Sequence, residues 1–166
     1  MQSTATAPAS SSAAAFESTW TPGWPVDLLR ALSPHRRGTG DPTLRIAADG
    51  LWRTTTTADG PATVRIAGSA GTVRIWAWGP GGERAGSAVP AWLGAADRPE
   101  EFEPGDSHPL VADLHRRAGV VRLGRTGRTW DALVPAVLEQ KVTTAEANRV
   151  WRELLRLAGE PLDAAQ

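Results

Sequence analysis

The residues best suited to contact phosphate groups gather in one stretch of the chain. Five arginines, with no acidic residue between Leu114 and Trp130, lead into an apolar run that ends at a polar turn. The arginines are Arg116, Arg117, Arg122, Arg125 and Arg128. The turn holds Gln140 and Lys141, the only lysine of the chain, and Thr143 follows it. Because arginines and the amides at a helix start both bind phosphates, the stretch indicates a phosphate-contacting surface. A solvated loop between helices is the alternative.

Other patterns that could support catalysis or ion binding are weak. The sequence has no phosphate loop, nucleophile elbow or zinc-protease motif. The glycine cluster at 79–82 follows a predicted strand, but its spacing matches neither glycine motif for phosphates, so a plain turn is favoured over a phosphate cradle. His108 and His115 have Asp113 between them, and without a further clustered ligand we expect surface histidines rather than a metal site. We expect no cofactor and no metal.

Composition narrows the class of protein. The chain has 166 residues, 18 basic and 18 acidic side chains, and no cysteine. The lack of cysteine excludes disulfide scaffolds, Cys-ligated metal sites and thiol nucleophiles. Zero net charge argues against reliance on a strong overall positive field, although local basic patches still attract nucleic acid. Since neither a signal-peptide pattern nor a run of about 20 apolar residues is present, we expect a cytoplasmic protein without membrane contact.

Strands are the first of the predicted elements that must position the arginine-rich stretch and its turn. Four strand-like runs follow one another at short spacing, separated by turn sequences such as Asp49-Gly50. They are residues 43–47, 51–57, 62–67 and 72–78. Apolar residues alternate with polar ones, as Val64 and Ile66 do with Thr63 and Arg65, which predicts an antiparallel sheet with one buried face. A helix capped by Asp27 and one over 82–93, broken or kinked near Pro90, are expected to cover that face.

The chain divides into four predicted parts. Residues 1–15 form a Ser/Ala-rich tail without large apolar side chains, which predicts disorder. Residues 16–96 form the sheet-containing domain, and 97–107 an acidic linker with five carboxylates. Residues 108–166 show only helical patterns. The fold class predicted is therefore α+β, an antiparallel four-stranded sheet with helices followed by the first helices of an all-α module.

The last predicted helix carries the clearest signals. Helices are expected over 108–118, 129–140 and 143–158. Thr143 and Glu146 match a capping box, and apolar residues recur at helical spacing from Ala147 to Ala158. Such wide apolar faces need further partners, so we interpret the all-α module as incomplete.

One run of residues carries a resemblance to a known family. The run Ala136-Val137-Leu138-Glu139-Gln140-Lys141-Val142-Thr143-Thr144-Ala145-Glu146-Ala147, preceded by His108-Pro109-Leu110-Val111 and Arg122-Leu123, resembles the opening of the catalytic domain in the helix-hairpin-helix DNA glycosylases. The likeness is closest to DNA-3-methyladenine glycosylase II. Upstream, Trp20-x-Pro22, Pro25-Val26-Asp27-Leu28 and the four strands are similar to that family's N-terminal domain, whose fold resembles half of a TATA-binding protein. The likeness spans about residues 16–161 and is specific at 133–147.

This resemblance implies a function in base excision repair. Such enzymes extrude an alkylated base from double-stranded DNA and hydrolyse its N-glycosidic bond, with a carboxylate supporting the cationic sugar. The turn matching Gln140-Lys141 enters the DNA, where the methylene stem of Lys141 could fill the gap and its ammonium reach a phosphate. The DNA-binding residues expected are Gln140, Lys141, Thr143, Arg125 and Arg128.

The catalytic centre is expected outside this chain. The family's hairpin with its glycine-rich loop, and the aspartate after it, belong downstream of residue 166, so no catalytic residue is assigned. No aspartate in the chain sits in a matching motif; those considered are Asp97, Asp106, Asp113, Asp131 and Asp163. A C-terminal fragment or partner chain would then supply the missing part. Two alternatives remain open, a non-enzymatic DNA-binding or interaction module and a partly unfolded fragment.

Overall fold

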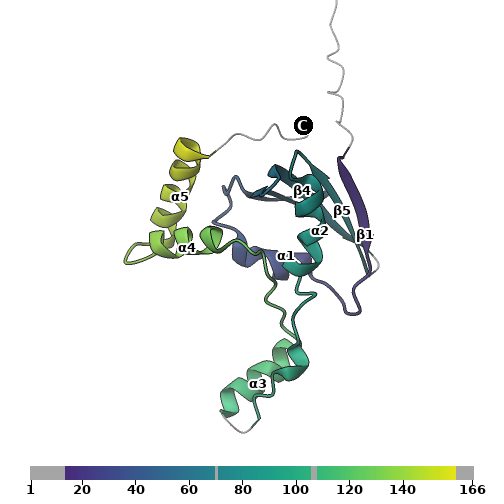
Figure 1. Cartoon of the computed structure of the whole chain (residues 1–166). Helices are drawn as coiled ribbons and strands as arrows, with labels where there is room; N and C mark the ends of the chain where they lie inside the picture. The colour runs from purple at the N-terminus through teal and green to yellow at the C-terminus, as the bar shows by residue number, and fades with distance from the viewer. Residues whose placement is uncertain (1–13, 70, 106–107, 160–166) are drawn as a thin grey trace, which may run out of the picture.

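One antiparallel sheet forms the centre of an α+β fold (Figure 1). The computed structural model describes residues 14–69, 71–105 and 108–159. Within them, five strands lie in the order β1-β5-β4-β3-β2, and every neighbouring pair is antiparallel. The strands are β1 Phe16–Trp20, β2 Leu44–Ala47, β3 Gly50–Thr57, β4 Gly60–Ser69 and β5 Thr72–Trp78.

Helices cover one face of this sheet. They are α1, Leu28–Leu32, followed by a 3-10 turn at Ser33–His35, and α2, Gly82–Trp92. The covered face carries the apolar side chains that the alternation predicted, and Val64, Ile66 and Ile75 are at most 1% exposed. Val89 of α2 and Leu32 of α1 belong to the same buried cluster. The prediction of a sheet with one buried face is confirmed.

The sheet has one strand more than the four predicted. β1 pairs along β5 from Phe16 opposite Ala77 to Trp20 opposite Val73. The spacing argument missed it because a long connection containing α1 separates β1 from the regular run of strands. Packing fixes it in place, since the ring of Phe16 lies against Gly86 of α2, where any side-chain carbon would overlap the ring. The expectation of a four-stranded sheet is therefore corrected to five strands.

The second helix is not broken at Pro90, the proline at which a break or kink near its end was expected. α2 continues beyond Pro90 to Trp92, and the amide of Leu93 donates to the carbonyls of Val89 and Pro90. A proline removes only one backbone donor here, and the burial of Val89, Trp92 and Leu93 holds the last turn on the sheet.

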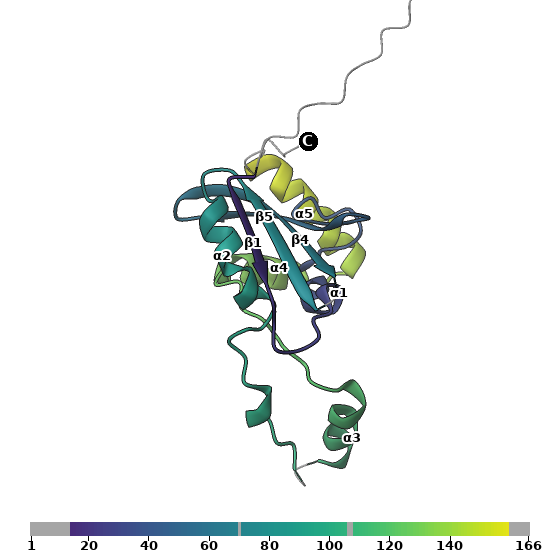
Figure 2. The same cartoon turned by 90° about the vertical axis from the view of Figure 1, so that its right-hand side faces the viewer.

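The remaining helices lie outside the sheet and its two covering helices. They are α3, Pro109–Ala118, α4, Thr129–Leu138, and α5, Thr144–Ala158. α4 and α5 form a hairpin on one side of the sheet, while α3 stands apart from it (Figures 1 and 2). The predicted linker contains a 3-10 turn at Pro99–Glu101, and its residues 106 and 107 lie outside the described residues. So do residues 1–13 of the predicted tail.

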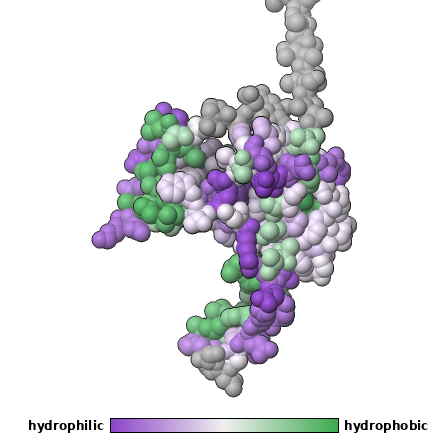
Figure 3. All heavy atoms as spheres, in the orientation of Figure 1, coloured by the Kyte–Doolittle hydropathy of each residue, from purple (hydrophilic) through white to green (hydrophobic). Residues whose placement is uncertain are grey.

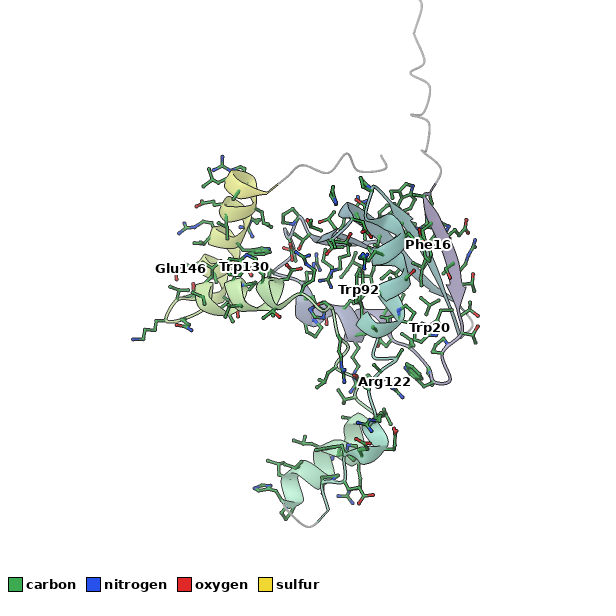
Figure 4. The ribbon with its side chains drawn as sticks, viewed as in Figure 1. Phe16, Trp20, Trp92, Arg122, Trp130 and Glu146 are labelled. Carbon is green, nitrogen blue, oxygen red and sulfur yellow. The ribbon has the colours of Figure 1, made fainter. Side chains whose placement is uncertain are left out.

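Arg122 anchors the segment that joins α3 to α4 (Figure 4). Its Nη1 donates to the carbonyls of Gly94 at 2.8 Å and Asp97 at 3.0 Å, and its guanidinium lies 3.6 Å from the ring centroid of Trp24. The carboxylate of Asp97 in turn accepts from the amides of Leu123 and Gly124. This junction holds the segment against the end of α2. In the part of the chain that the structure describes, no helix has the length and apolarity to span a membrane.

Candidate nucleic-acid interface

The turn between α4 and α5 presents the predicted Gln140 and Lys141 at the outer end of a helical hairpin. The amide of Gln140 donates to the carbonyl of Val137 at 3.2 Å, which closes the end of α4. Lys141 follows with a φ of 58°, the left-handed conformation that reverses the chain before α5. Both residues are exposed, and Lys141 has no acidic partner within 4.0 Å among the residues placed in the structure. The ammonium is therefore available to a ligand.

Thr143 is committed to the start of α5 rather than to a ligand. Its hydroxyl accepts from the amide of Glu146 and donates to the Glu146 carboxylate at 2.7 Å, which also accepts from the Thr143 amide at 2.9 Å. The predicted capping box is thus present. The hydrogen bond from the Thr143 amide holds the pKa of Glu146 below its ordinary value. Figure 4 shows Glu146 at the start of α5. Because its carboxylate already accepts from an amide of this helix start, a phosphate here would contact Lys141 first.

The arginine-rich stretch divides into anchoring and exposed residues. Arg116 and Arg117 both pair with Asp113 on α3, at 3.1 and 2.8 Å. Arg128 donates from Nε to Asp131 at 2.8 Å and from Nη1 to the carbonyl of Thr56 on β3, so its guanidinium fastens α4 to the sheet. Arg122 is anchored as described above, which leaves Arg125 as the member whose side chain is exposed and unpaired among the described residues.

The predicted DNA-binding residues do not form one cluster. Arg125 and Arg128 precede α4, whereas Gln140 and Lys141 follow it. A helix of 10 residues is about 15 Å long, so these two pairs lie at opposite ends of the hairpin's first helix. Two separated contacts of this kind could touch phosphates several nucleotides apart, but they could not act on one atom.

The described aspartates of the helical part all have structural partners. Asp97 accepts two backbone amides, Asp113 pairs with two arginines, and Asp131 pairs with Arg53 and Arg128. None of these three belongs to the α4–α5 turn. Asp106 and Asp163 lie outside the described residues. No described aspartate of the helical part therefore lies where it could support a reacting sugar at Lys141, and the carboxylates of this turn are those of Glu139 and the capping Glu146.

The two histidines weighed as metal ligands have other surroundings. His108 precedes α3 as its N-cap residue, and the ring of His115 packs edge-on against Phe102 with centroids 5.3 Å apart. Within the ranges given above, no three His, Asp or Glu side chains gather in a way that could hold a metal ion.

The open face of the sheet carries a row of aromatic and cationic side chains that the sequence reasoning did not single out. Strand register places four residues side by side across β2, β3, β4 and β5. They are Arg45, Trp52, Arg65 and Trp76, which we call the tryptophan–arginine row. In Figure 2, strands β1, β5 and β4 lie in front of α4 and α5, so the helical hairpin does not cover this face.

Cation–π contacts connect the members of the row. The Arg65 guanidinium lies 4.1 Å from the centroid of Trp76 and 5.8 Å from that of Trp52. Arg74 lies 4.7 Å from Trp76, and Trp78 stacks on Trp52 with centroids 5.4 Å apart. Contacts of this kind contribute about 0.5–1 kcal/mol each at exposed sites. The signal in the sequence was the placing of Trp and Arg at the polar positions of the alternation, but only the register shows that they meet.

Apolar side chains remain exposed on the helices outside the sheet. Trp130, Leu133 and Val137 recur at helical spacing on α4 and are each at least 50% exposed. Leu157 of α5 and Leu114 of α3 are also exposed, and Figure 3 shows hydrophobic surface on both the α4–α5 hairpin and α3. The described helices therefore leave apolar surface uncovered, as is typical of surfaces on which other elements or proteins pack.

Neither the comparison with protein-family models nor the comparison with curated proteins finds a relative of this chain. No protein-family model matches the chain, and no curated protein matches it. A function must therefore be argued from the α4–α5 turn, the tryptophan–arginine row and the apolar helix faces.

Proposed function

We propose that this chain is the DNA-contacting part of a repair glycosylase of the 3-methyladenine type. The observation that carries the proposal is the α4–α5 turn, which presents Lys141 in a left-handed conformation at the exposed end of a helical hairpin. The residues of this turn are those in which the sequence resembles the helix-hairpin-helix DNA glycosylases. In this reading, the chain binds duplex DNA that contains alkylated bases.

The predicted DNA-binding residues have different roles when the duplex opens. The methylene stem of Lys141 fills the space that a flipped nucleotide leaves, and its ammonium contacts a neighbouring phosphate. Arg125, about one helix length away, contacts the backbone farther along and sets the orientation. Arg128 and Thr143 act indirectly, because they hold α4 on the sheet and fix the start of α5.

Hydrolysis of the N-glycosidic bond requires a catalytic carboxylate, and Asp97, Asp113 and Asp131 are all engaged by other groups away from the turn. We propose that the catalytic carboxylate comes from a further helical segment, of the same protein or of a partner chain. The exposed apolar residues of α4 and α5 supply a surface on which such helices would pack. Excision of an alkylated base by these 166 residues alone would contradict this division of labour.

Binding to a duplex at several salt concentrations tests the DNA-contacting role. Replacing Lys141 by alanine should weaken binding about 3- to 10-fold and lower the salt slope by about one, because one phosphate contact is lost. Arg156→Ala is the matched control, since it removes one exposed positive charge at the other end of α5. Equal losses in the two variants would mean that only overall charge matters, and the role of the turn would be refuted.

A second candidate function is supported by the tryptophan–arginine row. Aromatic rings and guanidinium groups on an open sheet suit stacking against unpaired bases and contact with their phosphates. The chain would then be a non-enzymatic nucleic-acid-binding module. Trp76→Ala distinguishes the two candidates. If the tryptophan–arginine row binds the nucleic acid, this variant should lose most of the binding. If the α4–α5 turn binds it, Trp76→Ala should bind like wild type and only Lys141→Ala should bind more weakly.

A further inference from the structure

A small polar cavity lies where the α4–α5 hairpin meets the sheet. Its volume is about 70 Å³, which exceeds the roughly 30 Å³ share of one water molecule. Residues from five parts of the fold line it: His35 and Arg37 after α1, Leu44 on β2, Arg53 on β3, Asp131 on α4 and Trp151 on α5.

Three of the lining residues present nitrogen atoms that lack partners. Arg53 Nη1, Arg37 Nε and His35 Nε2 are buried and have no hydrogen-bond partner among the described residues. Both guanidinium nitrogens can only donate, and a neutral imidazole can donate from Nε2. Arg53 is 6% exposed, and its nearest carboxylate, that of Asp131, is 3.9 Å away. Arg37 Nη1 donates to the carbonyl of Pro34, and the Arg53 guanidinium lies 4.9 Å from the ring centroid of Trp92, but neither contact serves the unpaired nitrogens. A buried donor without a hydrogen bond is costly, so these nitrogens call for an acceptor.

The side chains around the cavity carry more positive than negative charge, which also favours an anion. Arg37, Arg53 and Arg128 bring three positive charges, whereas the carboxylates nearby are Asp131 and Asp41. Asp131 is shared between two arginines, and Asp41 already accepts from the amide of Arg37, from Thr43 and from the indole of Trp151. Positive charge and unused donors therefore exceed what the neighbouring carboxylates accept.

We propose that this cavity binds a small tetrahedral oxyanion of the phosphate or sulfate class. Its oxygens accept from Arg53 Nη1, Arg37 Nε and His35 Nε2, and its charge offsets the excess of guanidinium. Because the donors come from β3 and from the segment after α1, the bound anion stabilises the contact between these two segments at the edge of the hairpin. This site is separate from the α4–α5 turn.

The protonation of His35 agrees with this arrangement. Burial lowers the pKa of His35, the neighbouring Arg53 and Arg37 lower it further, and Asp131 acts in the opposite direction. A bound anion would raise that pKa, because it stabilises the protonated ring. Anion binding should therefore strengthen as the pH falls through the range in which His35 takes up its proton.

Thermal unfolding of the whole chain tests the proposal, with inorganic phosphate compared with chloride at matched ionic strength. Phosphate at ten times its dissociation constant should raise Tm by about 4 °C. Arg37→Gln should abolish the rise, because it removes one donor and one charge from the cavity wall. Arg36→Gln is the matched control and should keep it, since Arg36 neighbours Arg37 but does not line the cavity.

Two further arms keep the result decisive. Arg53→Met replaces the buried cation with an apolar side chain and should leave Tm insensitive to phosphate. If that variant does not fold, the Arg37 and Arg36 pair still decides. Equal stabilisation by chloride, or a phosphate effect that survives in Arg37→Gln, would overturn the proposal. A duplex oligonucleotide bound at the α4–α5 turn should raise Tm equally in wild type and in Arg37→Gln. A rise that Arg37→Gln abolishes would identify a nucleic-acid phosphate as the ligand of the cavity and refute a free anion.

Discussion

The sheet with α1 and α2 and the helices α3 to α5 are built on different principles. In the first region, Val64, Ile66, Ala77 and Val89 have no exposed surface, and the core joins all its layers. In the second, Pro135 and Ala147 are the buried residues of the described helices, and polar or charged groups such as Arg128 make the attachment to the sheet.

This difference indicates which of the two regions contributes most to the stability of the fold. Burial of apolar area is the main favourable term in folding. The sheet, α1 and α2 bury their apolar side chains against one another. The helical region holds its position through a few hydrogen bonds and ion pairs while its apolar faces stay in solvent. We therefore expect the sheet region to set the global stability and the helices to open at lower free energy.

The largest expected effect comes from removing core volume. Ile66→Ala should lower the free energy of unfolding by about 3–4 kcal/mol, because the site is closed on all sides and a cavity remains. Leu157→Ala on α5 should change it by less than about 0.5 kcal/mol, since that side chain is 77% exposed. Urea unfolding measures both. Similar losses in the two variants would erase the distinction between the regions.

An intermediate effect is expected at the contact between the regions. Asp131→Asn leaves Arg53 buried without its carboxylate and frees Arg128, which should cost about 2 kcal/mol. Hydrogen exchange should show faster opening of α4 and α5, with β4 and β5 unchanged. Asp113→Asn is the control, because its arginine partners are exposed and the expected loss is below about 0.5 kcal/mol. Uniform loosening of sheet and helices would argue for one cooperative unit.

The smallest effect is local and depends on pH. The folded-state pKa of Glu146 is lowered, so its contribution is present above the ordinary value of 4.5 and disappears as the pH falls through the folded value. The Thr143 amide resonance should shift as this capping bond is lost, while resonances of the sheet stay in place. Glu146→Gln should remove the shift, and a wild-type resonance that stays constant through this range would contradict the prediction.

Much of the fold could be predicted from local patterns. The run 72–78 coincides with β5, and the helix expected over 129–140 is α4, which ends at Leu138. Periodicity and turn residues act over short distances, so they are visible in the sequence. β1 was not predicted, because its partner β5 lies far away along the chain.

The candidate sites were less predictable, because they depend on contacts between distant residues. Arg128 carries the same charge as Arg125, yet Thr56 and Asp131 engage it in the folded chain while Arg125 stays exposed. The cavity around Arg53 brings together residues of five segments whose proximity no spacing rule indicates. The pairing of Trp76 with Arg65 likewise requires the register of two strands.

The backbone of Lys141 gives the α4–α5 turn an additional meaning. A left-handed conformation costs a lysine about 1 kcal/mol relative to glycine, which adopts it freely. A turn selected for stability alone would therefore have glycine at this position. Lys141→Gly should therefore relieve this strain while removing the ammonium, so one substitution changes the stability of the turn and its charge in opposite directions.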